Sequence, residues 1–242
     1  MIELPVLGAE DANIWTALLE LSTRVPEQWT LIGGQMVLLH GLENGRQPPR
    51  VSQDLDLMVD ARVRPRALPK VAQALADMDF ELVEVTFDEI AHRFVRGAIS
   101  IDVLAPEGTG KRTDLRLLGS IQVVQIRGGT AALGRSQPVE VAHRGLTGTV
   151  WRPDLLGALL VKSEAACHDS RRGPERHVTD LAFLYSMVAD PLSIRAETSR
   201  KQRGTLRNVP ELQRGDQQAW RSLGGGLGQD AFAAFELISR PD

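Results

Sequence analysis

The stretch from Trp29 to Asp60 constrains the fold of this chain more than any other, because its hydrophobic pattern changes several times over a short distance. An apolar run at residues 29–32 (WTLI) stops at two glycines, Gly33 and Gly34. Residues 35–42 follow with apolar side chains at helical spacing, and after a polar loop with two prolines a second apolar run begins at Asp54. This order predicts strand, tight turn, helix, loop and strand.

The second of these strands carries two carboxylates, Asp54 and Asp56. Side chains on a strand alternate between faces, so the two acids share one face while Leu55 and Leu57 point into a core. Carboxylates one strand step apart, about 6–7 Å between Cα atoms, repel each other unless a cation lies between them. Hard oxygen ligands suit Mg²⁺, which is usually held by one or two carboxylates together with substrate phosphates. The pattern predicts a magnesium site.

The glycine pair has a chemical meaning of its own. Glycine lets the backbone approach a ligand closely, and the N–H groups at a helix N-terminus bind anions. A phosphate cradle at Gly33-Gly34 beside metal ligands at Asp54 and Asp56 indicates chemistry on a nucleotide.

A third carboxylate is expected to join this cluster. Residues 90–104 (IAHRFVRGAISIDVL) predict a hairpin that turns near Gly97, and its second arm alternates so that Asp102 lies opposite the aliphatic face. A buried aspartate costs roughly several kcal/mol unless it is paired or bound to metal. We therefore predict that Asp102 completes the metal site with Asp54 and Asp56.

The remaining pattern predicts an α/β (α+β) fold. A small mixed sheet flanked by helices forms residues 1–150, and a mainly helical C-terminal lobe forms residues 151–242, with the active cleft between them. The boundary is placed near Trp151. The expected elements outside the organising stretch are helices at 11–24, 62–77, 154–168, 174–188 and 230–239, strands at 80–85, 121–126, 139–142 and 149–151, and a glycine linker at 224–226.

Composition limits the environment and the partners. The net charge is −3, so no global positive field favours binding of nucleic acid. A local nucleic-acid track through phosphate contacts is still open to the basic runs at 62–70, 171–176 and 195–207. A single cysteine, Cys167, excludes an intramolecular disulfide framework and fits a reducing compartment. No signal peptide and no membrane-spanning apolar run are present, so a cytoplasmic protein without a membrane partner is expected.

Gly33-Gly34 followed by residues 50–56 (RVSQDLD) resembles the signature of the nucleotidyltransferase superfamily. More narrowly, it resembles the AbiEii/MenT-type minimal nucleotidyltransferases, toxins of bacterial toxin–antitoxin pairs, in which such a turn and an Arg-x-Ser/Thr-x-Asp-x-Asp strand open the catalytic domain. The likeness covers about residues 28–190 and implies that Arg50 and Ser52 join the glycines in binding the nucleotide.

The resemblance also assigns two residues in the second lobe. In that group a later helix bears a lysine, here Lys162, and a Lys-Asp-x-x-Asp-Leu segment follows, where this chain has Arg176 and His177 in place of the first two residues and keeps Asp180. Lys162 is either a point charge on the triphosphate or a lysine that snorkels to the surface. Asp180 either has a catalytic or network role or pairs with Arg176 four residues earlier.

The resemblance implies a Mg²⁺-dependent enzyme that moves a nucleoside monophosphate from a nucleoside triphosphate to an acceptor hydroxyl. It further implies that the acceptor is RNA, at the 3′ end of tRNA, and that a cognate antitoxin protein silences the toxin. Two alternatives stay open: the acceptor is a protein or a small molecule such as an antibiotic, or the chain is a catalytically silent nucleotide- or partner-binding module. The altered Arg176-His177 pair motivates the silent version.

Overall fold

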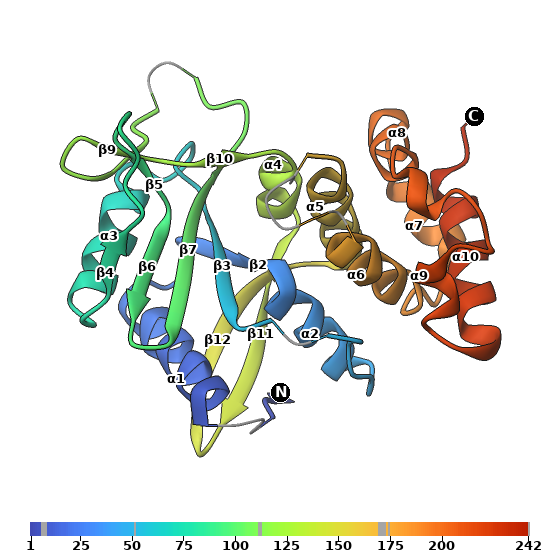
Figure 1. Cartoon of the computed structure of the whole chain (residues 1–242), viewed down its shortest axis with the longest axis horizontal. Helices are drawn as coiled ribbons and strands as arrows, with labels where there is room; N and C mark the ends of the chain where they lie inside the picture. Colours follow the sequence, from blue (N-terminus) through green and yellow to red (C-terminus); the bar gives the residue numbers. More distant parts are fainter. Residues whose placement is uncertain (6–8, 51, 111–112, 169–172, 174, 242) are drawn as a thin grey trace.

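The computed structural model describes residues 1–5, 9–50, 52–110, 113–168, 173 and 175–241. It is a mixed α and β structure, which confirms the predicted fold class (Figure 1). The sheet strands occupy one side of Figure 1 and the last helices the other, with two long helices between them. A continuous hydrophobic cluster runs through all of these parts.

The central sheet is mixed and has the strand order β2-β3-β7-β6-β4, with β10 added beside β7. β3 runs parallel to β7 and antiparallel to β2, and β6 runs antiparallel to both β7 and β4. The strands of this sheet are β2 (Trp29–Ile32), β3 (Asp54–Val59), β4 (Glu81–Val83), β6 (Arg93–Arg96), β7 (Ile99–Pro106) and β10 (Gln125–Ile126).

Two smaller sheets flank the central one. The first has the order β1-β11-β12, with β1 (Ile2–Glu3), β11 (Ser136–His143) and β12 (Leu146–Pro153). The second has the order β5-β9-β8, with β5 (Ile90–Ala91), β8 (Arg116–Leu118) and β9 (Ile121–Val123). Trp151, where the domain boundary is predicted, lies inside β12.

The helices of the sheet half are α1 (Ala9–Arg24), α2 (Gly33–Glu43), α3 (Ala67–Ala76) and α4 (Gly129–Gly134). Those that follow β12 are α5 (Leu155–His168), α6 (Glu175–Tyr185), α7 (Pro191–Glu197), α8 (Arg200–Arg207), α9 (Gln218–Arg221) and α10 (Gly225–Ser239), with a short 3-10 turn η1 (Pro210–Leu212). Among the described residues, none of the helices combines the length and apolar character that a bilayer span requires.

Three local predictions were wrong. Helix α3 begins at Ala67 rather than Arg62, because Arg66 takes a left-handed conformation (φ 63°) that breaks the helical pattern. α4 lies in a stretch predicted to hold only strands and turns, where its small residues pack against α5. The glycine linker is not a linker, since α10 already begins at Gly225.

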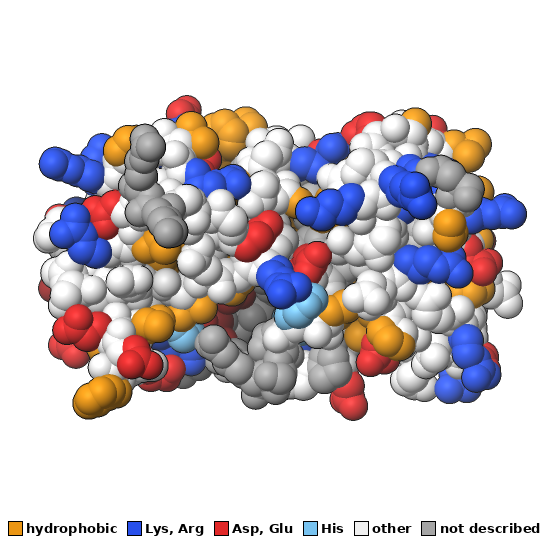
Figure 2. Space-filling model, turned by 90° about the horizontal axis from the view of Figure 1, so that it is seen from above, with side chains coloured by type: hydrophobic (Ala, Val, Ile, Leu, Met, Phe, Trp, Pro, Cys, Tyr) orange, Lys and Arg blue, Asp and Glu red, His pale blue; other side chains and the backbone are white. Residues whose placement is uncertain are grey.

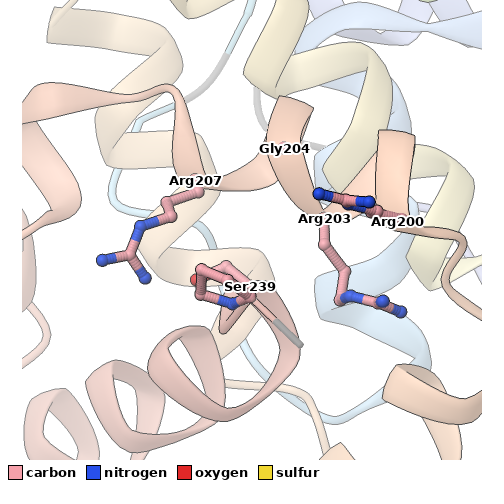
Figure 3. A pocket seen from close by; sticks show the side chains of 6 residues that line it. Arg200, Arg203, Gly204, Arg207 and Ser239 are labelled. Atoms are coloured by element: carbon pink, nitrogen blue, oxygen red, sulfur yellow. The ribbon is translucent and has the colours of Figure 1, made fainter.

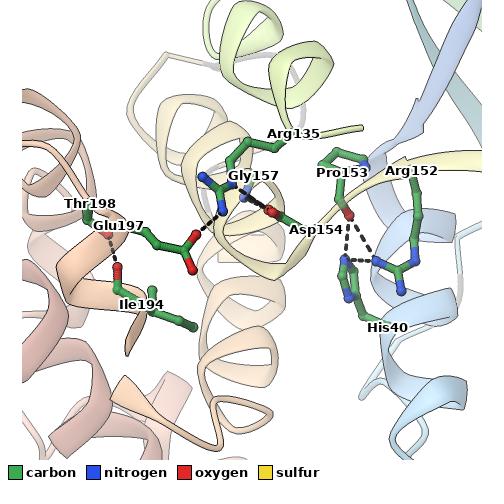
Figure 4. A network of polar contacts seen from close by, with 9 residues as sticks. All are labelled: His40, Arg135, Arg152, Pro153, Asp154, Gly157, Ile194, Glu197 and Thr198. Carbon is green, nitrogen blue, oxygen red and sulfur yellow. Dashed lines mark hydrogen bonds and ion pairs between the residues drawn. The ribbon is translucent and has the colours of Figure 1, made fainter. Parts of the chain in front are cut away.

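Two polar networks hold the elements together: the first fixes the helical half to the sheet half, and the second holds α2 against β12 within the sheet half (Figure 4). Arg135, which ends α4, donates hydrogen bonds to Asp154 before α5 and to Glu197 at the end of α7. On β12, Arg152 and the Nε2 atom of His40 both contact the backbone carbonyl of Pro153. Burial, and then the charge of Arg152, lower the pKa of His40 to about 3, so this histidine is neutral at physiological pH.

The strand, helix and strand predicted within residues 29–60 are present as β2, α2 and β3. Gly33 determines how closely the turn between β2 and α2 approaches β3. Ile32 pairs with Asp56 across β2 and β3, so the glycine that follows turns directly over that carboxylate. Gly33 has φ +71°, and a Cβ atom there would lie 1.8 Å from Asp56 Oδ2. Two independent features therefore require glycine at position 33: the left-handed backbone angle and the close approach to Asp56.

We expect Gly33→Ala to destabilise the fold more than Gly45→Ala. Gly45 has φ +65° with nothing within 4 Å of its added Cβ, so it pays only the left-handed backbone cost of about 1–2 kcal/mol. Gly33→Ala must also displace Asp56, which adds about 1–3 kcal/mol. Urea denaturation of both variants measures the difference, and equal losses would contradict the close contact.

Candidate active site

A cleft of about 480 Å³ lies between the central sheet and helices α5 and α6. It collects side chains from the β2–α2 turn, from the loop before β3, and from β3, β6, β7, α5 and α6. All the site residues predicted from the sequence except Asp180 line it, namely Gly33, Gly34, Arg50, Ser52, Asp54, Asp56, Asp102 and Lys162. Of the signature segment 50–56, Val51 lies outside the described residues, as do Arg171 and Arg172 of the basic run 171–176.

The acidic wall of the cleft is set by the register of β3 and β7. These parallel strands place Asp56 beside Asp102 and Asp54 beside Ser100. The Ser100 hydroxyl donates a hydrogen bond of 2.5 Å to Asp54 Oδ1. The fold therefore brings Asp102 of β7 together with two carboxylates of β3 that lie much earlier in the sequence.

The pKa of Asp56 is strongly perturbed. Burial raises its pKa to about 6, and the negative charges of Asp102 and Asp54 add to that effect against the opposing charges of Lys162 and Arg176. The carboxylate form of Asp56 is thus held at a free-energy cost in the folded chain, which a bound cation would offset.

Asp102 has a partner that the sequence analysis missed. Arg93 donates from Nε to Asp102 Oδ1 and from Nη2 to Oδ2, both at 2.8 Å. The hydrogen bond to Asp102, more than any other contact, raises the pKa of Arg93. The signal was available, because Arg96 pairs with Ile99 around Gly97 and this register places Arg93 opposite Asp102.

The donor chemistry of the acids bears on a metal site. Asp54 and Asp56 present carboxylate oxygens on one face of β3, and these are the hard oxygen ligands that Mg²⁺ prefers. Within the described part of the chain, however, no group of three or more His, Cys, Asp or Glu side chains has the arrangement of a metal site. Since both oxygens of Asp102 accept from Arg93, its role as third ligand stays a prediction.

The glycine turn closes one end of the acidic wall. A Cβ atom on Gly34 would lie 2.4 Å from Ser52 Cβ, so the turn packs against the loop before β3 as well as against Asp56. Gln35 holds the same loop by donating to the Ser52 carbonyl at 2.5 Å. The N-terminus of the eleven-residue helix α2 is thereby placed at the cleft, in the position predicted for a phosphate cradle.

Opposite the acids, a buried carboxylate holds two cations. Asp180 on α6 is 1% exposed. Arg50 donates to it through Nε at 2.9 Å and Nη2 at 2.5 Å, and Lys162 Nζ on α5 donates at 2.6 Å. We call these three residues the Asp180 clamp.

The clamp excludes one of the two interpretations that the sequence left open for Lys162 and one of the two for Asp180. Lys162 is 3% exposed and does not snorkel to the surface. Asp180 bonds to Arg50 and Lys162 rather than forming the helix-surface pair with Arg176. Burial by itself raises the pKa of Asp180, but the positive charge of Lys162 and the contacts of Arg50 outweigh burial and hold that pKa below its usual range.

The site has to be interpreted from its own chemistry. Comparisons of the chain with protein-family models, with curated proteins and with solved structures found no match. The chemistry is nevertheless specific in type: carboxylates on the sheet lie in the same cleft as Lys162 and Arg176, and the glycine turn lines that cleft as well. Such an arrangement suits a ligand that carries phosphate groups.

Several further residues line the cleft, and three of them carried no sequence signal. Arg127 and His168 lie 3.0 Å apart from Nη1 to Nε2 and line the cleft together with Gln125. Arg176 and His177, the pair that the sequence analysis singled out, also line the cleft, and His177 is buried. The substituted pair thus lies in the cleft rather than away from it.

We expect Asp180→Asn to destabilise the protein by about 3–5 kcal/mol, because it leaves two cations around a neutral buried amide. Since the folded pKa is lowered, the stabilisation by Asp180 is present above pH ~4 and is lost as the pH falls through the folded pKa. Urea denaturation at pH 7 is the measurement. The control Asp216→Asn removes an exposed partner of Arg214 and should leave the midpoint unchanged; similar losses in the two variants would contradict the clamp.

Asp56→Asn should have the opposite effect on stability. Because the folded pKa of Asp56 is raised from 3.8 to about 6, wild-type stability falls as the pH rises from about 4 to about 6 and then stays lower. The amide avoids this cost, so the variant should be more stable than wild type by up to ~3 kcal/mol at pH 8 and by nearly nothing at pH 4. Denaturation at both pH values in metal-free buffer tests this, and a gain independent of pH would refute it.

Proposed function

We propose that the chain is a nucleotidyltransferase that moves a nucleoside monophosphate from a nucleoside triphosphate to an acceptor hydroxyl. One observation carries this proposal. Asp54 and Asp56, next to the glycine turn, line the same cleft as the two cations that Asp180 holds. The resemblance of Gly33-Gly34 and residues 50–56 to the AbiEii/MenT-type enzymes supports the same reaction.

In this proposal Asp54 and Asp56 would hold Mg²⁺, and Asp102, which accepts hydrogen bonds from Arg93, would be its third ligand. When bound, the metal neutralises negative charge on the phosphates. The acceptor hydroxyl attacks the α-phosphorus, its proton passes to a carboxylate of the acidic wall, and pyrophosphate leaves.

The cations of the cleft contact the phosphates. An ammonium group has three N–H donors and a guanidinium has five, so bonds to Asp180 do not exhaust Lys162 or Arg50. The buried Asp180 fixes both heads in position before the ligand arrives, which is how preorganised charge stabilises a transition state. Asp180 acts through them and is a positioning residue. Backbone N–H groups of the Gly33-Gly34 turn, at the start of α2, complete the phosphate contacts.

The biological setting follows from the resemblance alone. We propose RNA, at the 3′ end of tRNA, as the acceptor and a toxin–antitoxin pair as the context, with an antitoxin protein as partner. The size of the cleft, about 480 Å³, accommodates a nucleotide.

The transfer reaction is tested with purified protein, Mg²⁺, each α-labelled nucleoside triphosphate and total RNA. Asp56→Asn should lower the label transferred on the order of a hundredfold or more, because it removes a charged group at the reacting phosphate. Asp60→Asn is the matched control: Asp60 directly follows β3, does not line the cleft, and contacts Arg62 instead. Its transfer should equal that of the wild type.

The location of the label separates the alternatives. Label in RNA supports the proposal, whereas label in protein or in small molecules keeps the reaction and replaces the acceptor. Nucleotide binding without any transfer would support the catalytically silent module. Full activity of Asp56→Asn would overturn the reaction itself.

A further inference from the structure

A second cavity, of about 360 Å³, lies in the helical half between α8 and the end of α10 (Figure 3). It is lined by Arg200, Arg203, Gly204, Arg207, Ser239 and Pro241. In Figure 3 the arginine side chains spread to either side of Ser239. None of these residues lines the cleft described above.

The wall supplied by α8 is a basic helix face. Positions 200, 203, 204 and 207 recur at helical spacing and so share one side of α8, whose sequence RKQRGTLR contains no acidic residue. Neither Arg200 nor Arg207 forms an ion pair with a carboxylate of the described chain. Lys and Arg side chains gather over this half of the molecule in Figure 2. The positive charge is available to a ligand.

Arg200 and Gly204 are poor choices for the stability of α8. Arg200 stands at the first position of α8, where the helix dipole disfavours a cation. Gly204 lies inside the helix, where alanine is intrinsically more stable, and an added Cβ would meet nothing within 4 Å. No backbone angle and no close contact require glycine there, but its missing side chain leaves the cavity open between the arginines.

Ser239 supplies the independent sign of a ligand. Its side chain is 1% exposed, and its Oγ atom has no hydrogen-bond partner within the described part of the chain. A buried hydroxyl without a partner is unfavourable, and an oxygen of a bound anion would satisfy it. Guanidinium groups and a hydroxyl donor together match the donors that bind phosphate.

We propose that this cavity binds a backbone phosphate of the RNA acceptor. The inference rests on the proposed function for the identity of that acceptor. α8 connects the two sites, because Thr205 on its inner side donates to Glu164, which lines the cleft. A helix is about 10–12 Å thick, so a strand whose end lies in the cleft can pass over α8 and reach the cavity a few nucleotides away.

The test measures binding of a fluorescein-labelled 12-nucleotide oligouridine by anisotropy, at several salt concentrations. Arg200→Gln with Arg207→Gln should weaken binding about ten- to thirty-fold at 0.1 M salt and reduce the slope of log affinity against log salt by about 0.7, which is the contribution of one phosphate contact with a single strand. Arg116→Gln with Arg144→Gln makes the same charge change at exposed positions of the sheet half, outside the basic runs named above, and should have little effect.

A second pair of variants keeps the arginines in place. Gly204→Glu places a carboxylate in the cavity and should weaken oligouridine binding much more than Gly204→Gln, which has the same size without the charge. Both substitutions fill open space on α8, so the fold should be retained, as thermal denaturation will show.

The outcomes distinguish this site from the reaction. No oligouridine binding by the wild type, or equal weakening by the two double variants, overturns the inference even where transfer to another acceptor is found. Selective weakening by the α8 variants, with binding of nucleoside triphosphate unchanged, supports it. If RNA binds in this way but no transfer is detected, the cavity stands and the proposed reaction fails.

Discussion

The buried carboxylate of Asp180 is the interaction on which the site depends. It accepts hydrogen bonds from Arg50, in the loop before β3, and from Lys162, on α5, and so joins the sheet half to the helical half. A buried ionised carboxylate is tolerated only when it is fully paired, and here two cations supply the pairing. The same bonds fix both cationic heads at the wall of the cleft, so one contact stabilises the fold and prepares the site.

On the acidic wall of the cleft, by contrast, carboxylates lie close to one another and repel. The register of β3 and β7 places Asp54, Asp56 and Asp102 in one region. The raised pKa of Asp56 results from burial first and from the repulsion between these carboxylates second. Arg93 relieves part of it by holding Asp102. A fold that keeps crowded acids against a glycine turn loses stability there, and such losses are typical of sites that a ligand completes.

Prediction from the sequence succeeded where a local pattern was long and regular. Alternation placed Asp54 and Asp56 on one face of β3, and the hairpin around Gly97 placed Asp102 on β7. It failed where a short pattern was overruled: Arg66 turns left-handed before α3, and α10 takes up the glycines expected to form a linker. Packing against neighbouring helices outweighs weak local preferences of this kind.

The sequence by itself determined which side chains share a strand face and where the chain turns tightly, because both follow from backbone geometry over a few residues. Only the tertiary structure decided the partners. Arg50 and Asp180 are separated by 130 positions, and no period in the sequence links them. The basic cavity on α8 likewise needs Ser239 from another helix to become a site. Such contacts arise when distant elements pack, so they are properties of the folded chain and not of any segment of it.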